Sequence, residues 1–314
     1  MRSKAMQMSL AGAAAVALWC AGPLQAGEGF ENLTLSLSTS ARSILPLEPL
    51  PITITLANET NAVIMSHGVI APVDGAMNVQ VAGKGEAFVD FITDDWVHGF
   101  VEASSKPLRP GFVEKRSGYL YYASSTRPST KKGRYLMPES GTYRVRLVMT
   151  DVDTKRKLES NVLTLRAETQ VGADAAAYKY LKKVPDAAFL RRHGERLQSE
   201  SSRALVARQE EFLQRFAKSR YAPWLQYTLG RTYLRGVGKG VGAGMALLEK
   251  AAAYPHFFLA KEALAVLTKT ALKRDDLEKA KHYHKQLQQR FPKSGQVWEA
   301  AILIRRKERE KARR

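Results

Sequence analysis

The spacing of apolar residues changes once along this chain, near residue 168. From Phe30 to Ala167, apolar and polar residues alternate with a period of two, in segments rich in Thr, Val, Ile and Tyr. From Ala173 onward, apolar residues recur about every 3.6 positions, which is the helical period. A strand points successive side chains to opposite faces, whereas a helix repeats a face once a turn. The sequence therefore predicts a multidomain chain, with an all-β region over residues 27–168 and an all-α region over residues 169–304.

The alternating half contains short segments that predict strands, separated by Pro, Gly, Asn and Asp. These segments are Leu33–Leu37, Ile52–Leu56, Met77–Val81, Ala87–Ile92, Gly118–Tyr122, Thr142–Met149 and Asn161–Arg166. Many short strands with turn residues between them are typical of an antiparallel β-sandwich. Pro51 lies at the start of the second strand, where its missing N–H group is tolerated.

Parts of this half resemble a known kind of sandwich. The segment Leu47–Thr60 (LEPLPITITLANET) is similar to the entry segment of immunoglobulin-like envelope domains, which reads EPL, a strand, and then N-x-T, and proteinase-inhibitor-like sandwiches share this entry. Gly141–Arg146 (GTYRVR) and Glu159–Leu163 (ESNVL) are similar to the closing strands of the same domains. The resemblance implies an immunoglobulin-like scaffold, and a scaffold alone does not imply an activity.

The helical half carries an internal repeat. The segment Arg215–Ser219 (RFAKS) recurs 75 residues later as Arg290–Ser294 (RFPKS), and a helix containing Trp follows each copy. The expected helices, with breaks at Pro, Gly or Asp, cover Asp174–Leu181, Pro185–Leu190, Leu205–Phe216, Pro223–Leu234, Ala246–Ala253, Leu259–Lys273, Asp276–Arg290 and Val297–Lys311. Such regularly spaced helix pairs can stack to bury a continuous core.

Residues 200–300 resemble tetratricopeptide-type repeats of envelope proteins. Leu229-Gly230-Arg-Thr-Tyr233 matches the core of one unit, and Ala246 and Ala280 stand 34 residues apart where a small residue admits the partner helix. The glycine-rich segment Gly236–Gly244 is interpreted as a lengthened loop between two helices. Thr268, Ala271 and His284 depart from the repeat consensus, so an ordinary helical bundle stays open as the alternative.

The first 26 residues predict a secretory signal peptide. Arg2 and Lys4 precede the short apolar stretch Leu10–Trp19, and Ala26 supplies a small residue for cleavage. A stretch of this length is too short to span a bilayer as a helix. A retained anchor and lipid attachment at Cys20 stay open, although Trp19 stands where a lipoprotein signal wants a small residue. We expect a periplasmic or secreted protein, cleaved near Ala26.

Charge divides unequally between the two halves. The whole chain has 49 Lys and Arg against 30 Asp and Glu, a net charge of +19. Residues 27–168 are neutral, with 16 of each, whereas residues 169–314 hold 31 bases and 14 acids, a net charge of +17. An exported protein does not meet chromosomal DNA, so we expect no nucleic-acid partner. The charge instead predicts an acidic protein partner, or an anionic envelope lipid or glycan.

A search for reaction chemistry finds no catalytic, cofactor or metal motif. The glycines around Lys239 fail the phosphate-loop pattern because Gly240 replaces the Ser or Thr that should follow the Lys. His282 and His284 are two residues apart on a helix and point in different directions. Ser129 and Lys132 spell S-x-x-K without its companion motifs, and Asp151 and Asp153 are expected at a hairpin tip. We therefore expect a protein that is not an enzyme.

Two binding functions follow from these features. In the first, an envelope adaptor binds its partner in a basic groove of the helical repeats, with candidate residues Tyr227, Arg231, Arg235, Lys261, Lys269 and Lys273. The basic tail over residues 305–314 is either a solvated helix end or a contact with anionic surfaces, through Arg305, Arg306, Lys307, Arg309, Lys311, Arg313 and Arg314.

In the alternative function, the sandwich is an inhibitor-like or glycan-binding module, and the repeats only localise it. Its candidate surface is the segment Pro107–Arg134, where bases are interleaved with tyrosines. The same tyrosines fit half-buried sheet positions equally well. The residues concerned are Arg109, Lys115, Arg116, Tyr119, Tyr121, Tyr122, Arg127, Lys131, Lys132, Arg134 and Tyr135.

Overall fold

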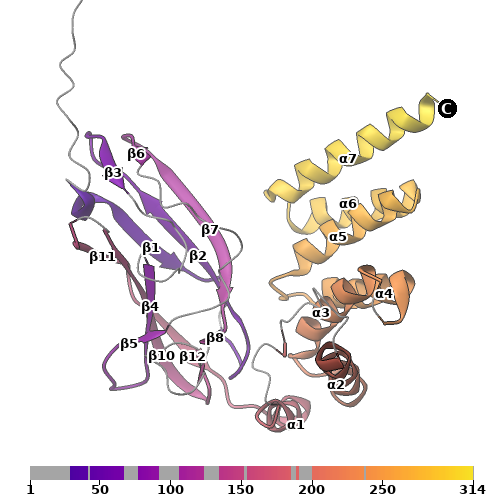
Figure 1. Cartoon of the computed structure of the whole chain (residues 1–314), viewed down its shortest axis with the longest axis horizontal. Helices are drawn as coiled ribbons and strands as arrows, with labels where there is room; N and C mark the ends of the chain where they lie inside the picture. Colours follow the sequence, from indigo (N-terminus) through magenta and orange to yellow (C-terminus); the bar gives the residue numbers. More distant parts are fainter. Residues whose placement is uncertain are drawn as a thin grey trace, which may run out of the picture.

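A computed structural model of the chain contains a β-sheet region followed by a region of packed helices (Figure 1). The structure describes residues 29–41, 43–66, 77–91, 106–123, 134–151, 154–184, 189–190, 200–236 and 238–313. The predicted signal peptide with Cys20 and Ala26 lies outside these residues. So do His67, His98, His193, Ser129, Asp153 and Arg314, and the bases Arg127, Lys131 and Lys132.

Two antiparallel sheets make up most of the β-sheet region. The first has the order β1-β2-β7, from strands Thr34–Ser38, Leu50–Ala57 and Val113–Leu120. The second has the order β11-β10-β4-β5, with β12 also paired to β10. Its strands are Lys157–Glu159 (β11), Gly141–Thr150 (β10), Met77–Ala82 (β4), Val89–Phe91 (β5) and Leu163–Ala167 (β12).

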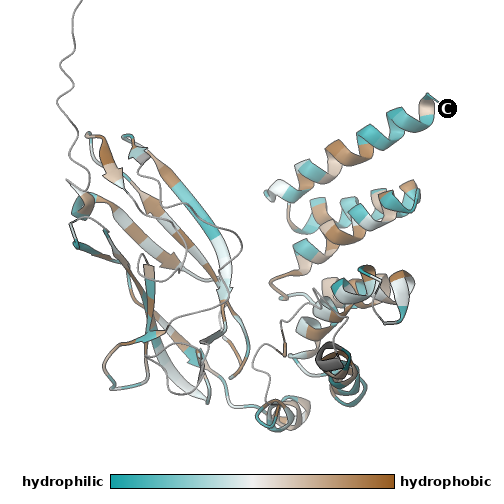
Figure 2. Ribbon diagram, viewed as in Figure 1, coloured by the Kyte–Doolittle hydropathy of each residue, from teal (hydrophilic) through white to brown (hydrophobic). Residues whose placement is uncertain are grey.

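The predicted alternation sets which side chains reach the core. In β2, Ile52, Ile54 and Leu56 are buried, and the threonines between them are partly exposed. In the second sheet, Leu147 of β10 stands opposite Val79 of β4. Both sheets contribute to one hydrophobic cluster, as period-two sequences with one buried face require. Figure 2 shows the alternation as hydrophobic and hydrophilic bands along the strands.

Five strands were not predicted as separate elements from the sequence. They form two small sheets and one sheet edge, namely β3 (Ile64–Ser66) with β6 (Lys106–Leu108), β8 (Tyr122–Ala123) with β9 (Arg134–Tyr135), and β11. None is longer than three residues, so none can show two full alternations. A short 3₁₀ turn, Phe30–Asn32, precedes β1.

The helical region stacks its helices in chain order beside the β-sheet region (Figure 1). The helices are α1 (Gly172–Leu181), α2 (Glu200–Phe216), α3 (Ala222–Leu234), α4 (Gly240–Ala253), α5 (Ala260–Lys273), α6 (Leu277–Arg290) and α7 (Gly295–Ala312). The predicted period is confirmed, and the expected tail from residue 305 continues α7 up to Ala312.

The repeated motif forms the same turn twice. The N–H of Ser219 donates to the carbonyl of Phe216 at 2.9 Å, and the N–H of Ser294 donates to the carbonyl of Phe291 at 2.9 Å. The first turn lies between α2 and α3, and the second lies between α6 and α7. Four of the five residues are identical and the hydrogen bond is the same, so the motif repeated after 75 residues forms the same local structure in both places.

The glycine-rich segment differs from the expected loop. Residues 240–244 belong to α4, so the turn between α3 and α4 is short. A Cβ atom on Gly230 would lie 2.9 Å from the Gly244 carbonyl oxygen, and one on Gly244 would lie 2.8 Å from the Gly230 carbonyl oxygen. These two glycines therefore let the backbones of α3 and α4 approach closely. The loop prediction is confirmed for Gly236 and Gly238, which precede α4 and have φ values of 86° and 84°. It was wrong for Gly244, where helix packing rather than turn freedom accounts for the glycine.

Candidate functional site: a basic groove between α1 and α2

An open groove of about 590 Å³ lies between the first two helices of the helical region. One wall comes from α1 and the three residues after it, and the other wall comes from α2. The lining residues are Ala176, Lys179, Tyr180, Lys183, Val184, Arg208, Glu211, Arg215 and Phe216. Four of the lining residues are bases and one is an acid, so the groove carries a net positive charge.

Helical spacing places the bases of each wall on the groove side. Lys179 and Lys183 are four residues apart, and Arg208 and Arg215 are seven residues apart. Residues at these separations share one helix face. All four bases are exposed.

Aromatic side chains form the floor of the groove next to these basic residues. The Tyr180 ring lies edge-on to Phe212 and Phe216, with centroid distances of 5.6 and 5.5 Å. Phe189 and Phe212 are buried, and their rings are 6.0 Å apart. Edge-to-face contacts of this kind fix ring positions as well as burying area. The groove therefore offers a packed aromatic surface next to exposed cationic side chains.

One of the four bases is already neutralised. Arg215 donates to Glu211 at 2.8 Å, and its guanidinium lies over the Tyr180 ring at 5.4 Å. Tyr180 also donates to Glu211 at 3.2 Å. The hydrogen bonds from Arg215 and Tyr180 hold the pKa of Glu211 below its usual range, so this carboxylate is charged at neutral pH. Arg208 also interacts electrostatically with Glu211 and adds to the lowering of its pKa. Among the residues that the structure describes, Lys179 and Lys183 are therefore the groove bases most available to an anionic ligand.

Contacts with the β-sheet region fix the position of α1. The Tyr178 hydroxyl lies 2.9 Å from the Pro138 carbonyl oxygen and 2.6 Å from a Glu139 carboxylate oxygen. Lys182 forms an ion pair of 2.8 Å with the same Glu139. One wall of the groove is thus attached to the sheets.

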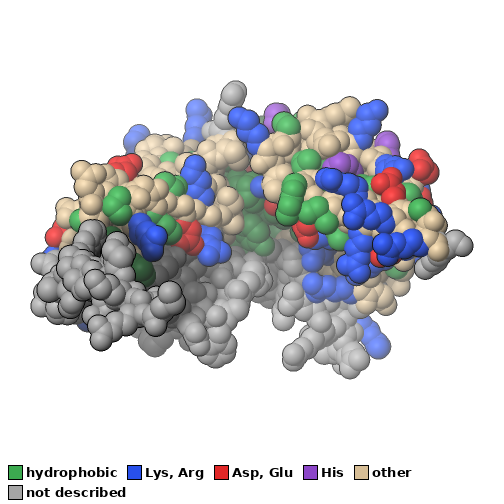
Figure 3. All heavy atoms as spheres, turned by 90° about the horizontal axis from the view of Figure 1, so that it is seen from above, with side chains coloured by type: hydrophobic (Ala, Val, Ile, Leu, Met, Phe, Trp, Pro, Cys, Tyr) green, Lys and Arg blue, Asp and Glu red, His purple; other side chains and the backbone are tan. Residues whose placement is uncertain are grey.

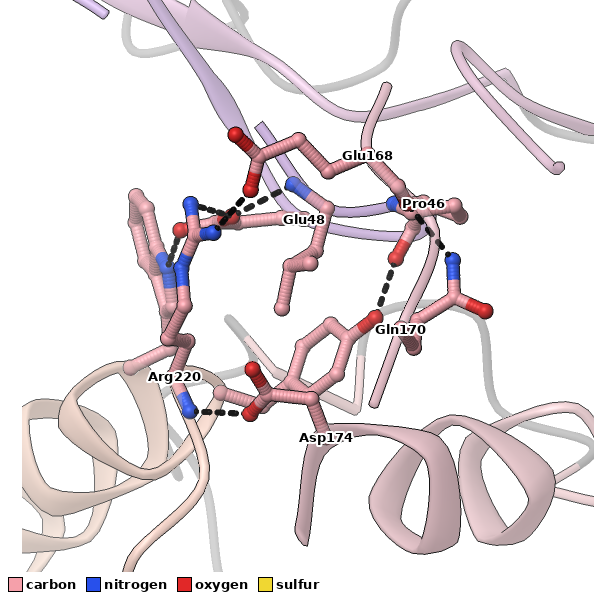
Figure 4. Close-up of polar contacts among 9 residues, drawn as sticks. Pro46, Glu48, Glu168, Gln170, Asp174 and Arg220 are labelled. Carbon is pink, nitrogen blue, oxygen red and sulfur yellow. Dashed lines mark hydrogen bonds and ion pairs between the residues drawn. The ribbon is translucent and has the colours of Figure 1, made fainter. Parts of the chain in front are cut away.

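Arg220, between α2 and α3, connects three parts of the chain (Figure 4). Its guanidinium donates to Glu168 at 2.6 Å and lies 3.8 Å from Glu48, while its backbone N–H donates to Asp174 of α1 at 2.7 Å. Glu48 also accepts hydrogen bonds from the Leu45 N–H at 2.9 Å and from the Trp224 indole at 3.3 Å. This network joins the end of the sheets, α1 and the start of α3.

The apolar core also crosses this junction. Leu45, Leu47 and Tyr121 of the β-sheet region are buried in the same cluster as the helical residues. Separating the chain near residue 168 would expose these side chains to water. Binding experiments therefore need the two regions together.

The predicted groove residues on α3 are mostly enclosed by the protein itself. Tyr227 is only 5% exposed, and its hydroxyl accepts a hydrogen bond of 3.0 Å from Arg231. The Arg231 guanidinium lies 5.8 Å from the centre of the Tyr227 ring. Arg235 lies exposed just beyond the end of α3. The structure thus brings together Tyr227 and Arg231, but as a packed pair.

The predicted groove residues on α5 do not gather in one place, and each has its own neighbours. Lys261 lies 3.7 Å from Glu262 and 5.6 Å from the centre of the Phe258 ring. Lys269 forms an ion pair of 2.7 Å with Glu299 of α7. Lys273 is the exposed last residue of α5. None of the predicted groove residues lines the α1–α2 groove.

The tyrosines proposed for glycan binding pack against aromatic side chains of the protein itself, and Tyr119, Tyr122 and Tyr135 are half-buried. Tyr119 lies edge-on to Trp224 of α3, with ring centroids 5.9 Å apart. Tyr121 is 2% exposed, and the rings of Tyr121 and Tyr122 both contact Tyr135. Among the bases of this segment, Arg109 and Lys115 are exposed, and Arg116 pairs with Glu114 at 2.9 Å. The described tyrosines therefore hold the junction together.

The predicted tail residues lie along the last turns of α7. Lys307 and Lys311 form ion pairs with Asp275 at 3.0 and 3.8 Å, and Arg306 pairs with Glu310 at 3.1 Å. Arg305, Arg309 and Arg313 are exposed. Figure 3 looks down onto α7 and shows Lys and Arg side chains gathered at this end of the molecule.

The described residues contain no group of three or more His, Cys, Asp or Glu that could hold a metal ion. Within the same residues, no helix is both long enough and apolar enough to cross a membrane. Asp151 follows β10 and accepts two hydrogen bonds of 2.8 Å from Thr154, which places it at the expected turn before β11.

Comparisons with known proteins assign no family. The sequence matches no protein-family model and no curated protein. Among solved structures, a β-glucosidase from Listeria innocua in complex with glucose is 14% identical, with a TM-score of 0.25 over 45% of this chain. Spo0M, a sporulation control protein from Bacillus subtilis, is 11% identical, with a TM-score of 0.25 over 48% of this chain and 56% of its own. This chain spans 17% of the β-glucosidase chain.

Proposed function

We propose that this protein is a non-enzymatic envelope adaptor that binds an acidic segment of a partner protein in the α1–α2 groove. The observation that carries the proposal is the placement of three exposed bases, Lys179, Lys183 and Arg208, beside the packed aromatic rings of Tyr180 and Phe216. An acidic segment with one apolar or aromatic side chain would use both features. The carboxylates would meet the bases, and the apolar side chain would lie along Tyr180 and Phe216.

The wider charge distribution supports this partner. The helical half has a net charge of +17, which would speed the approach of an acidic partner and make its capture sensitive to salt. The predicted signal peptide, with cleavage near Ala26, supports a periplasmic or secreted location, where acidic proteins and anionic glycans are available.

We also propose that the helices are tetratricopeptide-like repeats. Support comes from the duplicated turn at Ser219 and Ser294 and from the close crossing at Gly230. An immunoglobulin-like sandwich remains the proposal for the sheets. Its support is the core that both main sheets share.

A labelled peptide with four glutamates around one tryptophan tests the groove directly. Binding to the full-length mature chain is measured by fluorescence anisotropy at increasing salt concentration. The variant K179Q/K183Q should bind about tenfold more weakly, because two of the four bases that line the groove are removed. The variant R305Q/R309Q removes the same charge from α7 and should bind like the wild type.

A second peptide, with glutamines in place of glutamates, separates charge from apolar contact. This peptide should bind too weakly to detect, because its glutamines have no negative charge to pair with the basic residues of the groove. Equal loss of binding in both double variants would show that net charge alone attracts the peptide, and it would overturn the assignment to this groove.

A further inference from the structure

Two apolar residues and two arginines lie in one row along the outer face of α7. Trp298, Ile302, Arg305 and Arg309 follow at intervals of four, three and four residues. At about 100° per residue, these four positions fall within roughly 60° of the helix circumference. They therefore form a single stripe, called here the α7 stripe.

The α7 stripe faces away from the helical core. Ala300 and Ile304 are buried where α7 packs against α5 and α6. Trp298 and Ile302 lie on the other side of the helix, and they are 69% and 40% exposed. The two side chains are one helical turn apart, so they form one exposed apolar strip on this side of α7.

The cations of α7 divide into two sets. Lys307 and Lys311 are held by Asp275 of the turn before α6, and Arg306 is held by Glu310. Arg305 and Arg309 continue the line of the exposed apolar residues. The charged end seen in Figure 3 therefore includes a subset that is aligned with an apolar anchor.

We propose that the α7 stripe rests on an anionic lipid bilayer. The Trp298 indole and Ile302 would enter the headgroup layer, and Arg305 and Arg309 would contact lipid phosphates. Tryptophan suits this layer because its ring is apolar and its N–H is polar. Basic residues next to an apolar helix face are attracted to anionic lipid surfaces.

The length of the apolar part favours a bilayer over a partner helix. A partner helix lying along α7 needs apolar contacts over two or more turns. The α7 stripe provides them over one turn, from Trp298 to Ile302, and arginines occupy the following positions. A bilayer needs only a shallow anchor and neighbouring positive charge, which is what this face supplies.

Sedimentation with vesicles tests this surface on the full-length mature chain. Vesicles of equal parts phosphatidylglycerol and phosphatidylcholine should bind the protein, and vesicles of phosphatidylcholine alone should not. R305Q/R309Q should partition about thirtyfold more weakly, since it loses two bases at an anionic surface. W298S should also weaken binding, and added salt should release the protein.

The variant K179Q/K183Q is the matched control, because it removes the same charge from α1. It should bind vesicles like the wild type while binding the acidic peptide about tenfold more weakly, so failure of this proposal and failure of the groove proposal are distinguishable. All the changed side chains are exposed, and thermal unfolding confirms that each variant folds. Equal vesicle binding by wild type and R305Q/R309Q would overturn the proposal. Binding of the acidic peptide at α7, with no vesicle binding, would also overturn it and identify a protein surface.

Discussion

The Tyr221 hydroxyl donates a hydrogen bond of 2.7 Å to the backbone carbonyl of Pro46, which lies 175 residues earlier in the chain. Tyr221 precedes α3 and is completely buried, and Pro46 precedes β2. The bond therefore ties the helices to the sheets inside the shared core. It makes the two regions one structural body at the place where their sequence patterns change.

Replacing Tyr221 with Phe should destabilise the protein by about 1–3 kcal/mol. The change leaves the buried Pro46 carbonyl without its donor while preserving the ring. Urea unfolding, followed by both circular dichroism and tryptophan fluorescence, measures the effect. Tyr143→Phe is the control, because its hydroxyl donates to the exposed Glu139 carbonyl, where water can substitute. A loss in Y143F as large as that in Y221F would argue against a special role for the junction.

Replacing Gly230 with Ala should destabilise the crossing of α3 and α4. The new methyl group would lie 2.8 Å from Leu248 Cγ and 2.9 Å from the Gly244 carbonyl oxygen. Alanine favours a helix by about 1 kcal/mol over glycine, but overpacking against backbone costs about 1–3 kcal/mol.

Gly242→Ala is the matched change for that test. It lies in α4, where a Cβ atom would meet nothing within 4 Å. We expect it to raise the midpoint of thermal unfolding slightly, while Gly230→Ala lowers it. A rise in both variants would contradict the close approach of the two helices.

The long elements could be predicted from sequence because each repeats its period several times. α5 and α6 match their predicted ranges to within one residue at each end. The glycine segment misled the prediction, since glycine is needed both in turns and at close helix crossings. Only the position of the neighbouring helix α3 shows that Gly244 is a helix-crossing glycine rather than a turn glycine.

The groove depends on a spatial arrangement that the sequence does not display. Lys179 and Arg208 are 29 residues apart, and they face each other because Tyr178 and Arg220 fix α1 against the sheets. The available signal was the spacing of bases around Tyr180 on one helix and Phe216 on the next. Tyr227 looked like a groove residue because it shares a face with Arg231, but that face is covered by Phe257 and the protein's own core.

The contribution of Glu48 to the stability of the protein should fall as the pH rises above the usual carboxyl range. Burial raises the pKa of Glu48 above its ordinary value of 4.5, and nearby Asp174 adds to this, while the Leu45 N–H, Arg220 and Trp224 oppose it. A carboxyl whose folded pKa is raised holds its proton more tightly in the folded state, so its contribution is lost as pH rises through that pKa. The stability of wild type relative to E48Q should therefore fall between about pH 4.5 and neutral pH.

Glu31 provides a control of opposite sign. Its pKa is lowered by a backbone hydrogen bond and by Arg156, which lies 2.7 Å away. The stability of wild type relative to E31Q should rise as pH increases through the carboxyl range. Urea titrations of the three proteins at several pH values measure both trends. If the stability of the wild type relative to E48Q and relative to E31Q changed in the same direction with pH, the opposite pKa shifts of Glu48 and Glu31 would be contradicted.

Asp275→Asn should leave binding to anionic vesicles within about twofold of the wild type. Asp275 lies in the left-handed backbone region, with φ of 63°, and asparagine tolerates that conformation. The change removes the acid that holds Lys307 and Lys311, but these lysines lie on the side of α7 opposite the α7 stripe, so a bilayer that contacts the stripe would not meet them. Asp276→Asn adds the same net charge one residue away and keeps the side-chain cap of α6, since asparagine caps helices well. Vesicle sedimentation measures both variants, and a severalfold gain in both would show that net charge, rather than the α7 stripe, sets the binding.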